Sequence, residues 1–408
     1  MARRVEHLLI GGGVAAASCA SQLREEGADG SILIVGRELD PPYHRPPLSK
    51  AYLGGSEARD AALFRPGEWW AGREIELLTR TSVMKLDAAA RVATLSTKEE
   101  VEFGSALIAT GANVRRLRAE GSELEGIHYL RAYGNADAIR ADAKGAARAV
   151  VIGGSYLGTE VAATLRGALG LDCSIVMQEG VTLERPYGPL IGGHFQRVLE
   201  EHGVRVHGGQ ELERFEGTDG RVRRVVTAAG LELECDLVVI GAGVMPDVTL
   251  ARAAGLDIGS SGGVRCSAGL ETSAPGIYAA GDMCEFESAL HGRRVRVEHS
   301  DVALEQGRTV AHNMLGRRRE HTAEPYFYSH LHDWASAESL GVGSGEPLLR
   351  GSLEDGEFSA FYLDHGRVTG ALSVGRPQDL EHARRLIAGR AGPEPALLAD
   401  PASDLAVL

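Results

Sequence analysis

The sequence lacks long apolar runs. The longest apolar stretches, such as residues 237–244, are far shorter than the roughly 20 residues that a membrane-spanning helix needs. Near the N-terminus the apolar run that begins at Leu8 reaches Gly11 within a few residues, which is too short and too glycine-rich for a signal peptide. We therefore expect a cytoplasmic protein with no membrane segment.

The sequence also lacks a cysteine motif and an excess of basic charge. Its five cysteines are scattered, with no Cys-x-x-Cys pair and no Cys/His cluster at metal-ligand spacing: Cys19, Cys173, Cys235, Cys266 and Cys284. Buried reduced thiols are the expected state, so neither a dithiol redox centre nor a metal site is predicted. The formal net charge of −13 argues against a nucleic-acid partner, because phosphates require basic patches.

One pattern occurs twice along the chain: an apolar strand, a glycine-rich turn, a helix of small residues and a second strand. The first copy has strands at 7–10 and 31–35 around a helix at 15–26, and the second has strands at 149–152 and 173–177 around a helix that ends near 169. Continuous apolar strands alternating with helices indicate parallel sheets covered on both faces. An α/β protein with two Rossmann-like dinucleotide-binding domains is therefore predicted. After about Glu324, strand-like runs at 357–363 and 367–374 and a helix near 377–388 indicate a small α+β C-terminal domain.

The first glycine turn reads Gly-x-Gly-x-x-Ala and contains Gly11, Gly13, Val14, Ala15 and Ala16. Its first glycine permits the tight turn, its second lets the backbone approach a pyrophosphate, and the alanine lets helix and strand pack closely. The pyrophosphate would then lie on the free N–H groups at the positive end of the helix. Glu38, about two dozen residues further on, is the candidate acceptor for an adenosine ribose hydroxyl.

The second turn is imperfect, because Ser155 stands where the middle glycine belongs, between Gly153 and Gly158. Two interpretations follow: a turn that still binds a dinucleotide, and a Rossmann-like domain that has lost this ability. Glu179 is the candidate ribose ligand in the first interpretation. It favours NADH over NADPH, because a carboxylate accepts a hydrogen bond from a 2′-hydroxyl and repels a 2′-phosphate.

Residues 42–50, Pro-Tyr-His-Arg-Pro-Pro-Leu-Ser-Lys, resemble a signature of the FAD-dependent NAD(P)H:ferredoxin (rubredoxin) reductase family. The resemblance continues over nearly the whole chain, through residues 107–111, 241–246, 277–282, 295–299 and 398–405. It implies a glutathione-reductase-type fold. In that fold an FAD-binding domain spans 1–115 and 245–322, an NAD(P)H-binding domain spans 116–244, and a C-terminal domain spans 323–408.

The resemblance also implies roles for individual residues. Lys50 would lie near flavin N5 and stabilise negative charge on the reduced flavin, and Glu160 would lie near the nicotinamide. Glu298 and His330 are the further catalytic candidates. Positions expected to contact FAD are Arg45, Lys50, Val83, Thr110, Gly111, Arg131, Gly281, Asp282 and Ser300. Positions expected to bind the nicotinamide nucleotide are Gly153, Tyr156, Leu157, Glu179 and Gly243.

Three departures from the family pattern fall where the flavin ring and the nicotinamide are expected: Ser155, Ser300 in place of a tryptophan after Glu-His, and His330-Leu331 in place of Asp-Gln. Loss of the tryptophan opens space, and His330 adds a side chain suited to proton transfer near neutral pH. Drift within a reductase remains the simplest explanation.

The leading functional prediction is an enzyme that passes hydride from NADH, less readily from NADPH, to FAD and passes electrons on to a ferredoxin-type iron–sulphur protein. Steering of an acidic ferredoxin would need a local basic patch, for which Arg293, Arg294, Arg296 and residues 317–319 are candidates. Two alternatives stay open: a flavoenzyme acting on a small organic substrate, and a redox-regulated flavoprotein of the apoptosis-inducing-factor type. A homodimer is compatible with each of them.

Overall fold

The computed structural model describes residues 3–343 and 345–408, which pack as two units. The first unit contains the chain up to His44, Arg59–Asn113 and Val244–Pro325, and the second contains Arg45–Ala58, Val114–Gly243 and Tyr326–Leu408. Within the described residues no helix is both long and apolar enough to cross a bilayer. In the same residues no three His, Cys, Asp or Glu side chains are grouped to hold a metal ion.

Strand β1 (Arg3–Ile10) lies in the middle of the seven-stranded sheet of the first unit. It pairs in parallel with β2 (Ile32–Val35) and β6 (Glu100–Ile108), and β18 (Ile277–Ala279) also pairs in parallel with β6. The strand order is β3-β2-β1-β6-β5-β4, with β3 at Ile75–Leu78, β4 at Val83–Asp87 and β5 at Val92–Leu95. The carboxyl ends of β1, β6 and β18 therefore lie at one edge of the sheet, where parallel α/β sheets bind their ligands.

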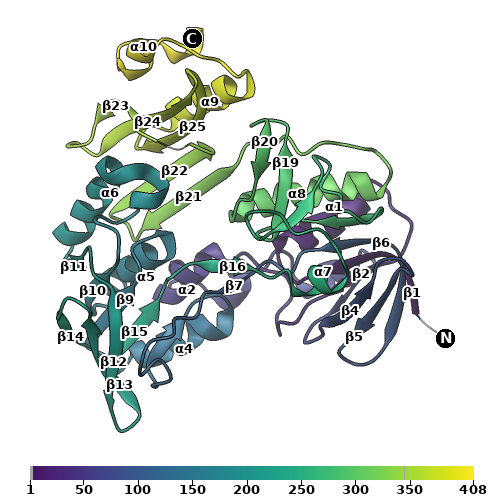
Figure 1. Ribbon diagram of the computed structural model, residues 1–408, viewed down its shortest axis with the longest axis horizontal. Helices are drawn as coiled ribbons and strands as arrows, with labels where there is room; N and C mark the ends of the chain where they lie inside the picture. Colours follow the sequence, from purple (N-terminus) through teal and green to yellow (C-terminus); the bar gives the residue numbers. More distant parts are fainter. Residues whose placement is uncertain (1–2, 344) are drawn as a thin grey trace. The chain divides into compact units, whose positions relative to one another are not determined.

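Helices α1 (Val14–Glu25) and α8 (Ser300–Met314) run side by side in the first unit (Figure 1). Their close approach depends on small residues, since a Cβ atom on Gly307 would lie only 2.3 Å from the Ala15 carbonyl oxygen. The smaller elements of this unit are η2 (Arg59–Ala62), α3 (Gly67–Ala71), β16 (Val244–Pro246), α7 (Thr249–Ala253), β17 (Val264–Cys266), β19 (Cys284–Ser288) and β20 (Arg293–Val295). Strand β7 (Ala112–Val114) begins in this unit, and its last residue belongs to the second.

A second parallel sheet, of order β11-β10-β9-β15-β8, forms the centre of the second unit. Its strands are β8 (Ile127–Tyr129), β9 (Arg148–Ile152), β10 (Asp172–Val176), β11 (Val204–His207) and β15 (Leu237–Ile240). Helices α4 (Tyr133–Ala143), α5 (Tyr156–Gly167) and α6 (Glu184–Glu201) connect or flank these strands, and α6 is kinked at Gly188, which has φ 81°. The first sheet is mixed, because β4 and β5 are antiparallel, but the parallel strands β3-β2-β1-β6 with β18 and the parallel second sheet confirm the predicted α/β class.

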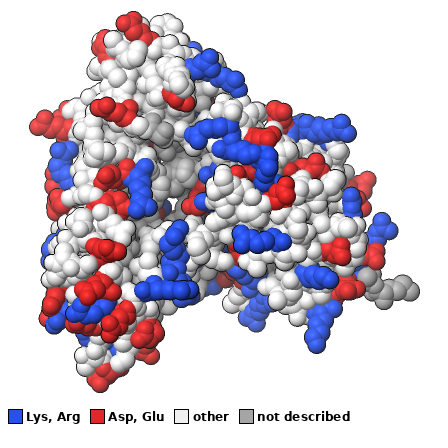
Figure 2. Space-filling view, viewed as in Figure 1, with Lys and Arg blue, Asp and Glu red and all other residues white. Residues whose placement is uncertain are grey.

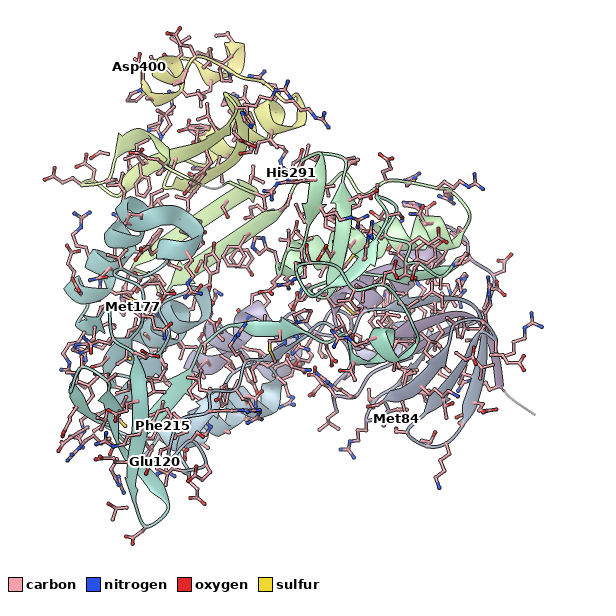
Figure 3. All side chains as sticks on the ribbon, in the orientation of Figure 1. Met84, Glu120, Met177, Phe215, His291 and Asp400 are labelled. Atoms are coloured by element: carbon pink, nitrogen blue, oxygen red, sulfur yellow. The ribbon has the colours of Figure 1, made fainter. Side chains whose placement is uncertain are left out.

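A three-stranded antiparallel sheet packs against this second parallel sheet. It consists of β12 (Leu212–Thr218), β13 (Arg221–Thr227) and β14 (Glu232–Glu234). Phe215 of β12 is buried in one apolar cluster with Val150 of β9 and Val238 of β15. Its backbone N–H donates to the carbonyl of Glu120 at 2.8 Å, and both residues are labelled in Figure 3. The cluster fixes the small sheet onto the Rossmann-like core.

The C-terminal part is an antiparallel sheet of order β21-β22-β25-β24-β23 with helix α9 (Pro377–Ala388) packed on it (Figure 1). Its strands are β21 (Tyr326–Leu331), β22 (Ala335–Gly341), β23 (Leu348–Ser352), β24 (Glu357–Asp364) and β25 (Arg367–Val374), and the chain ends through α10 (Pro395–Ala399) and η3 (Leu405–Val407). Buried Arg350 holds the end of the chain by donating to the carbonyls of Asp400 and Ser403. The predicted strands and helix of an α+β domain are present.

Residues Arg45–Ala58, which contain η1 (Pro46–Ser49) and α2 (Ala51–Gly54), pack with the second unit. The sequence places them in an FAD-binding segment at 1–115. Their contacts explain the difference: Arg45 donates to the Arg131 carbonyl, the Tyr52 hydroxyl donates to Asp137 Oδ1 at 2.5 Å, and Thr164 Oγ1 donates to the Ser49 carbonyl at 2.8 Å. The other predicted domain boundaries stay predictions.

Candidate functional site

The first glycine turn joins β1 to α1 in a conformation that depends on glycine. Gly11 has φ 135°, and a Cβ atom there would lie 2.1 Å from the Ala109 carbonyl oxygen. Gly13 is the N-cap of α1 and offers no side chain to the first N–H groups of the helix. A Cβ atom on Gly13 would meet no atom of the described chain within 4 Å. Space and free N–H groups in front of Gly13 thus fit a dinucleotide pyrophosphate.

Glu38, the candidate ribose acceptor, lies just beyond the end of β2. It is half-buried, and its Oε2 accepts a hydrogen bond from the Tyr43 hydroxyl at 2.5 Å. The glycine turn lies at this same end of β2, since the Gly11 N–H donates to the Val35 carbonyl at 2.8 Å. The hydrogen bond from Tyr43 therefore holds the Glu38 carboxylate at the sheet edge that carries the glycine turn. The position suits a hydrogen bond to a ribose hydroxyl.

Two further turns follow the neighbouring strands at the same edge. Thr110, after β6, donates from Oγ1 to the Asp247 carbonyl at 2.7 Å, and Gly111 has φ 70°. Gly281, after β18, has φ 81° and donates its N–H to Gln306 Oε1 at 2.7 Å. A Cβ atom on Gly281 would lie 3.8 Å from the Ala15 Cβ atom, which brings this turn against the start of α1. The structure therefore groups Gly11–Ala16, Thr110, Gly111 and Gly281 around one sheet edge.

Gln306 of α8 is a polar residue that the sequence motifs do not single out. Its side chain is fully buried, and its Nε2 makes no hydrogen bond within the described part of the chain. A buried amide without a partner is costly, so such a group beside Gly281 fits the acceptor atoms of a bound cofactor. The first unit thus offers an N–H cradle, a ribose acceptor and an amide donor, which together suit FAD.

The other first-unit candidates surround this edge less directly. Asp282 follows Gly281, and its carbonyl accepts from Arg296 Nη1 at 3.0 Å. Glu298 is exposed and pairs with Arg296 at 2.5 Å. Burial lowers the pKa of the neighbouring His299 to about 4, and the Asp282 charge acts in the opposite direction. Ser300 is the first residue of α8, and Val83 is the first residue of β4. The roles of Glu298, Ser300 and Val83 therefore stay predictions.

The second glycine turn, between β9 and α5, keeps the geometry of the first. Gly153 has φ 111°, and a Cβ atom there would lie 2.5 Å from the Gly241 carbonyl oxygen. A Cβ atom on Gly154 would lie 2.0 Å from the sulphur of Met177, which Figure 3 labels. Ser155 is the exposed N-cap of α5, and its φ of −87° and ψ of −172° are ordinary for an L-residue. Serine at this position is therefore unstrained and adds only its hydroxymethyl group to the turn.

The remaining nicotinamide candidates lie around this turn. Leu157 is half-buried in the first turn of α5, beside Tyr156, and Gly243 has φ 88° where the chain leaves β15. Glu179 lies beyond β10 and forms an ion pair with Arg185. Burial raises the pKa of the Tyr156 hydroxyl far above its usual range, so this group stays a neutral hydroxyl.

Four residues from distant parts of the second unit form a buried charge cluster: Ser49, Lys50, Glu160 and Ser329. Glu160 Oε2 accepts from Ser49 Oγ at 2.6 Å and pairs with Lys50 Nζ at 2.6 Å, and its Oε1 accepts from Ser329 Oγ at 2.8 Å. The side chains of Lys50 and Glu160 are 17% and 6% exposed. Charges buried to this degree require such pairing and hydrogen bonding. The cluster joins η1, α5 and β21.

Aromatic side chains alternate along β21 beside this cluster. Phe327 packs on Tyr156 of α5, with ring centres 4.2 Å apart. Tyr328 and His330 lie on the other face of the strand, with their ring centres 5.3 Å apart. The Lys50 Nζ atom is 5.7 Å from the centre of the Tyr328 ring. Burial and the Lys50 charge lower the pKa of His330, although Glu160 and Glu338 act in the opposite direction. His330 is therefore neutral near pH 7.

The structure brings together Lys50, Glu160 and His330 among the predicted residues, and Arg45 with Arg131. Sequence reasoning missed Ser49, Ser329, Tyr328 and Gln306. Ser49 lies inside the family-like motif at 42–50, and Ser329 directly precedes the His330-Leu331 departure, so a local signal was present at both positions. Their shared contact with Glu160 joins segments more than 100 positions apart in the chain, and that contact has no local signature.

The sequence and the structure are similar to those of known flavoprotein reductases. Residues 5–307 match the family described as pyridine nucleotide-disulphide oxidoreductase, and residues 340–408 match a domain described as reductase C-terminal. Rhodocoxin reductase of Rhodococcus erythropolis is 32% identical over 399 residues, which cover 98% of this chain and 93% of that protein. Putidaredoxin reductase of Pseudomonas putida is 34% identical over 400 residues, which cover 96% and 94%. The crystal structure of a covalent putidaredoxin reductase–putidaredoxin complex is similar with a TM-score of 0.93 at 32% identity, covering 98% of this chain and 97% of the matched one.

Proposed function

Because the chain belongs to the pyridine nucleotide-disulphide oxidoreductase family, we propose that it oxidises NADH, holds FAD, and delivers electrons singly to a ferredoxin-type iron–sulphur protein. Relatives similar over almost their whole length are named as rhodocoxin and putidaredoxin reductases, and one similar structure holds putidaredoxin in a covalent complex. Their similarity covers the C-terminal part as well as both glycine turns. The proposal therefore concerns the whole chain rather than one domain.

The observation that carries the proposal is the cradle at Gly13, combined with the state of the cysteines. Bound FAD supplies the chemistry that links a two-electron donor to one-electron acceptors. The chain supplies the N–H groups of α1, the Glu38 carboxylate and the Gln306 amide to bind it. All five cysteines are buried free thiols. A route to a separate acceptor needs no protein dithiol, whereas a disulphide reductase does.

Lys50 and Glu160 have distinct roles in this proposal. We assign Lys50 the role of a fixed positive charge that offsets negative charge on the reduced cofactor. Glu160 orients the ammonium group, and Ser49 and Ser329 hold the Glu160 carboxylate in turn. His330, neutral near pH 7 and close to the Lys50 charge, is the proposed group for holding or releasing a proton. Ser49 and Ser329 are thus positioning residues.

NADH is the proposed physiological donor. Glu179 follows β10 at the carboxyl edge of the second parallel sheet, the position from which a carboxylate accepts a hydrogen bond from an adenosine ribose hydroxyl. Ser155 leaves the turn backbone unstrained, which favours the interpretation in which the second turn binds a dinucleotide.

The surface charges bear on the partner. Figure 2 shows basic and acidic side chains intermixed over the visible face of each unit. Three arginines of the predicted basic patch are paired: Arg294 with Glu287, Arg296 with Glu298 and Arg317 with Glu26. Arg293 and Arg318 are exposed and are the members of the patch that we propose for contact with an acidic partner. Their contribution should fall as ionic strength rises.

The test has two stages. Purified protein is mixed anaerobically with NADH in a stopped-flow spectrometer, and bleaching of the flavin absorbance is followed. A ferredoxin-type iron–sulphur protein is then added, and its reduction is measured with and without the enzyme. Bleaching followed by reduction of the iron–sulphur protein supports the proposal. Bleaching without that reduction, but with turnover of a small quinone, would favour the alternative of a small organic substrate, which the Ser300 departure makes worth testing.

A further inference from the structure

Thr164 of α5 is a buried polar residue that contacts the segment carrying Lys50. It is 3% exposed, and its hydroxyl donates to the Ser49 carbonyl at 2.8 Å. Its methyl group faces α2, because a Cβ atom on Gly54 would lie 3.5 Å from Thr164 Cγ2. Both branches of the threonine side chain therefore contact the segment Arg45–Ala58, which packs with the same unit as α5.

The Ser49 carbonyl belongs to the peptide unit that joins Ser49 to Lys50. This unit is planar, so a hydrogen bond to its oxygen also fixes the direction of its N–H group and the place of the Lys50 Cα atom. The Lys50 N–H donates in turn to the Pro47 carbonyl at 3.1 Å. Thr164 and Pro47 thus hold the two polar groups of one peptide unit.

The charged end of Lys50 is held by the same helix. Its Nζ atom pairs with Glu160 Oε2 at 2.6 Å, and Glu160 precedes Thr164 by four positions, so both side chains lie on one face of α5. One helix face therefore holds Lys50 at both ends, at the backbone through Thr164 and at the ammonium group through Glu160. Fixing a long side chain costs rotamer freedom, and a charge fixed in advance is what electrostatic stabilisation of a cofactor requires.

We propose that Thr164 is a positioning residue for Lys50. It acts through the Ser49 carbonyl and sets the position from which the Lys50 ammonium group offsets negative charge on the reduced cofactor. Ser49 Oγ and Ser329, by contrast, act on the Glu160 carboxylate. Because α5 starts at the second glycine turn, Lys50 is fixed to the helix that would bind the nicotinamide nucleotide. This inference rests on the proposed function, because it requires the role assigned there to Lys50.

Thr164→Val removes the hydroxyl and keeps the shape of the side chain. Loss of one buried hydrogen bond corresponds to about a fivefold change in a local opening equilibrium, so acetylation of Lys50 by acetic anhydride should be about fivefold faster. The FAD midpoint potential should become more negative, because a less well placed cation stabilises the reduced cofactor less. Flavin bleaching at saturating NADH should slow by a similar factor, whereas the KM for NADH should stay within about twofold, since the glycine turn is unaltered. Thr164→Ser keeps the hydroxyl and should restore the unsubstituted values.

The lysine readout is clear because the chain has only four lysines. Lys50 is 17% exposed, and the other three are exposed and serve as internal standards: Lys85, Lys98 and Lys144. Thr227→Val is the matched control variant. Thr227 of β13 is fully buried, and its hydroxyl donates to Gln210 Oε1, also at 2.8 Å, beside the three-stranded sheet. This control should lose a similar hydrogen bond and leave Lys50 unaffected.

The experiment uses the flavin-loaded full chain and the Thr164→Val, Thr164→Ser and Thr227→Val variants. It measures acetylation of each lysine by mass spectrometry, the FAD midpoint potential by dye equilibration, and flavin bleaching by NADH. Faster acetylation of Lys50 together with a more negative potential, in Thr164→Val alone, supports the proposal. Unchanged acetylation or an unchanged potential in Thr164→Val, or the same changes in Thr227→Val, would overturn it.

A second variant and a second readout keep the test decisive. If Thr164→Val does not fold, Thr164→Ala removes the same hydroxyl and is judged by the same outcomes. If NADH does not bleach the flavin of the unsubstituted protein, the proposed function itself is contradicted. Acetylation of Lys50 and the potential are measured without NADH, so they still test the role of Thr164 in that case.

Discussion

Removal of the Glu160 carboxylate should destabilise the second unit far more than removal of an exposed carboxylate. Glu160→Ala leaves Ser329 without its acceptor and leaves Lys50, 17% exposed, without its counter-charge, while Ser49 keeps only its longer contact with the Pro46 carbonyl at 3.2 Å. A buried donor without a partner costs about 1–3 kcal/mol, and breaking a buried ion pair costs about 3–5 kcal/mol. These effects overlap because they concern one carboxylate. The expected loss in the free energy of unfolding is therefore about 3–5 kcal/mol in total.

The assay is a urea titration followed by far-ultraviolet circular dichroism, with hydrogen–deuterium exchange to locate the effect. Exchange should rise in Arg45–Ala58, α5 and β21, the three segments that meet at Glu160. The control is Glu232→Ala, which removes a 54% exposed carboxylate paired with Arg224 at 2.8 Å and should cost less than about 1 kcal/mol.

A second substitution separates charge from packing. Lys50→Met in the Glu160→Ala background removes the uncompensated charge and should restore part of the lost stability. The reasoning about a buried charge cluster is refuted by either of two results. In the first, the free energy of unfolding of Glu160→Ala lies within about 1 kcal/mol of that of the Glu232→Ala control. In the second, Lys50→Met lowers the stability of Glu160→Ala further.

Three further predictions concern the glycine turns and one histidine. The Gly13→Ala variant should fold normally, because its Cβ atom meets no described atom within 4 Å, but it should bind FAD at least about tenfold more weakly. The Gly11→Ala variant, by contrast, should disrupt the turn itself. If Gly13→Ala retains its flavin through gel filtration, the proposed FAD cradle at Gly13 is wrong. The Ser155→Gly variant should have a KM for NADH that is roughly several-fold lower in steady-state assays, because it removes a side chain that crowds the pyrophosphate. An unchanged KM would show that Ser155 does not face the nucleotide. Burial lowers the pKa of His321 from 6.5 to about 4, so its contribution is fully present above pH 6.5 and is lost as pH falls toward 4. That difference corresponds to about 3 kcal/mol, so urea titrations between pH 7 and pH 4 should show a smaller pH dependence in His321→Gln, and an unaltered dependence would refute the assignment.

The local parts of the fold could be predicted from the sequence, because their signals lie within a few residues of one another. The turns at Gly11 and Gly153 each follow an apolar strand and precede a helix of small residues, and the structure has both elements at these places. The strands and helix near the end of the chain were equally predictable, since the strand-like runs at 357–363 and 367–374 and the helix that starts at Pro377 are local features.

Long-range contacts could not be predicted in the same way. Lys50 and Glu160 were each named on a family resemblance, but nothing in their separate surroundings indicates that they form an ion pair. The grouping of Arg45–Ala58 with the second unit depends on contacts with Arg131, Asp137 and Thr164, all distant in sequence. Pairing across such distances reflects tertiary packing, which residue patterns along the chain do not encode locally.

Ser155 shows a different limit of sequence reasoning. The missing glycine leaves open in the sequence whether the second turn still binds a dinucleotide, whereas the structure gives this position φ −87°, which does not need the freedom of glycine. The basic patch shows the converse, because the sequence counts Arg294, Arg296 and Arg317 as charge that is available to a partner, whereas each is paired with a glutamate.

The most direct measurement is anaerobic reduction of the purified, flavin-containing protein by NADH, followed by transfer to a ferredoxin-type iron–sulphur protein in the same stopped-flow experiment. We expect flavin absorbance to be lost on mixing with one equivalent of NADH and to return as an excess of the iron–sulphur protein is reduced. A protein that contains FAD but shows no bleaching at millimolar NADH or NADPH would contradict it.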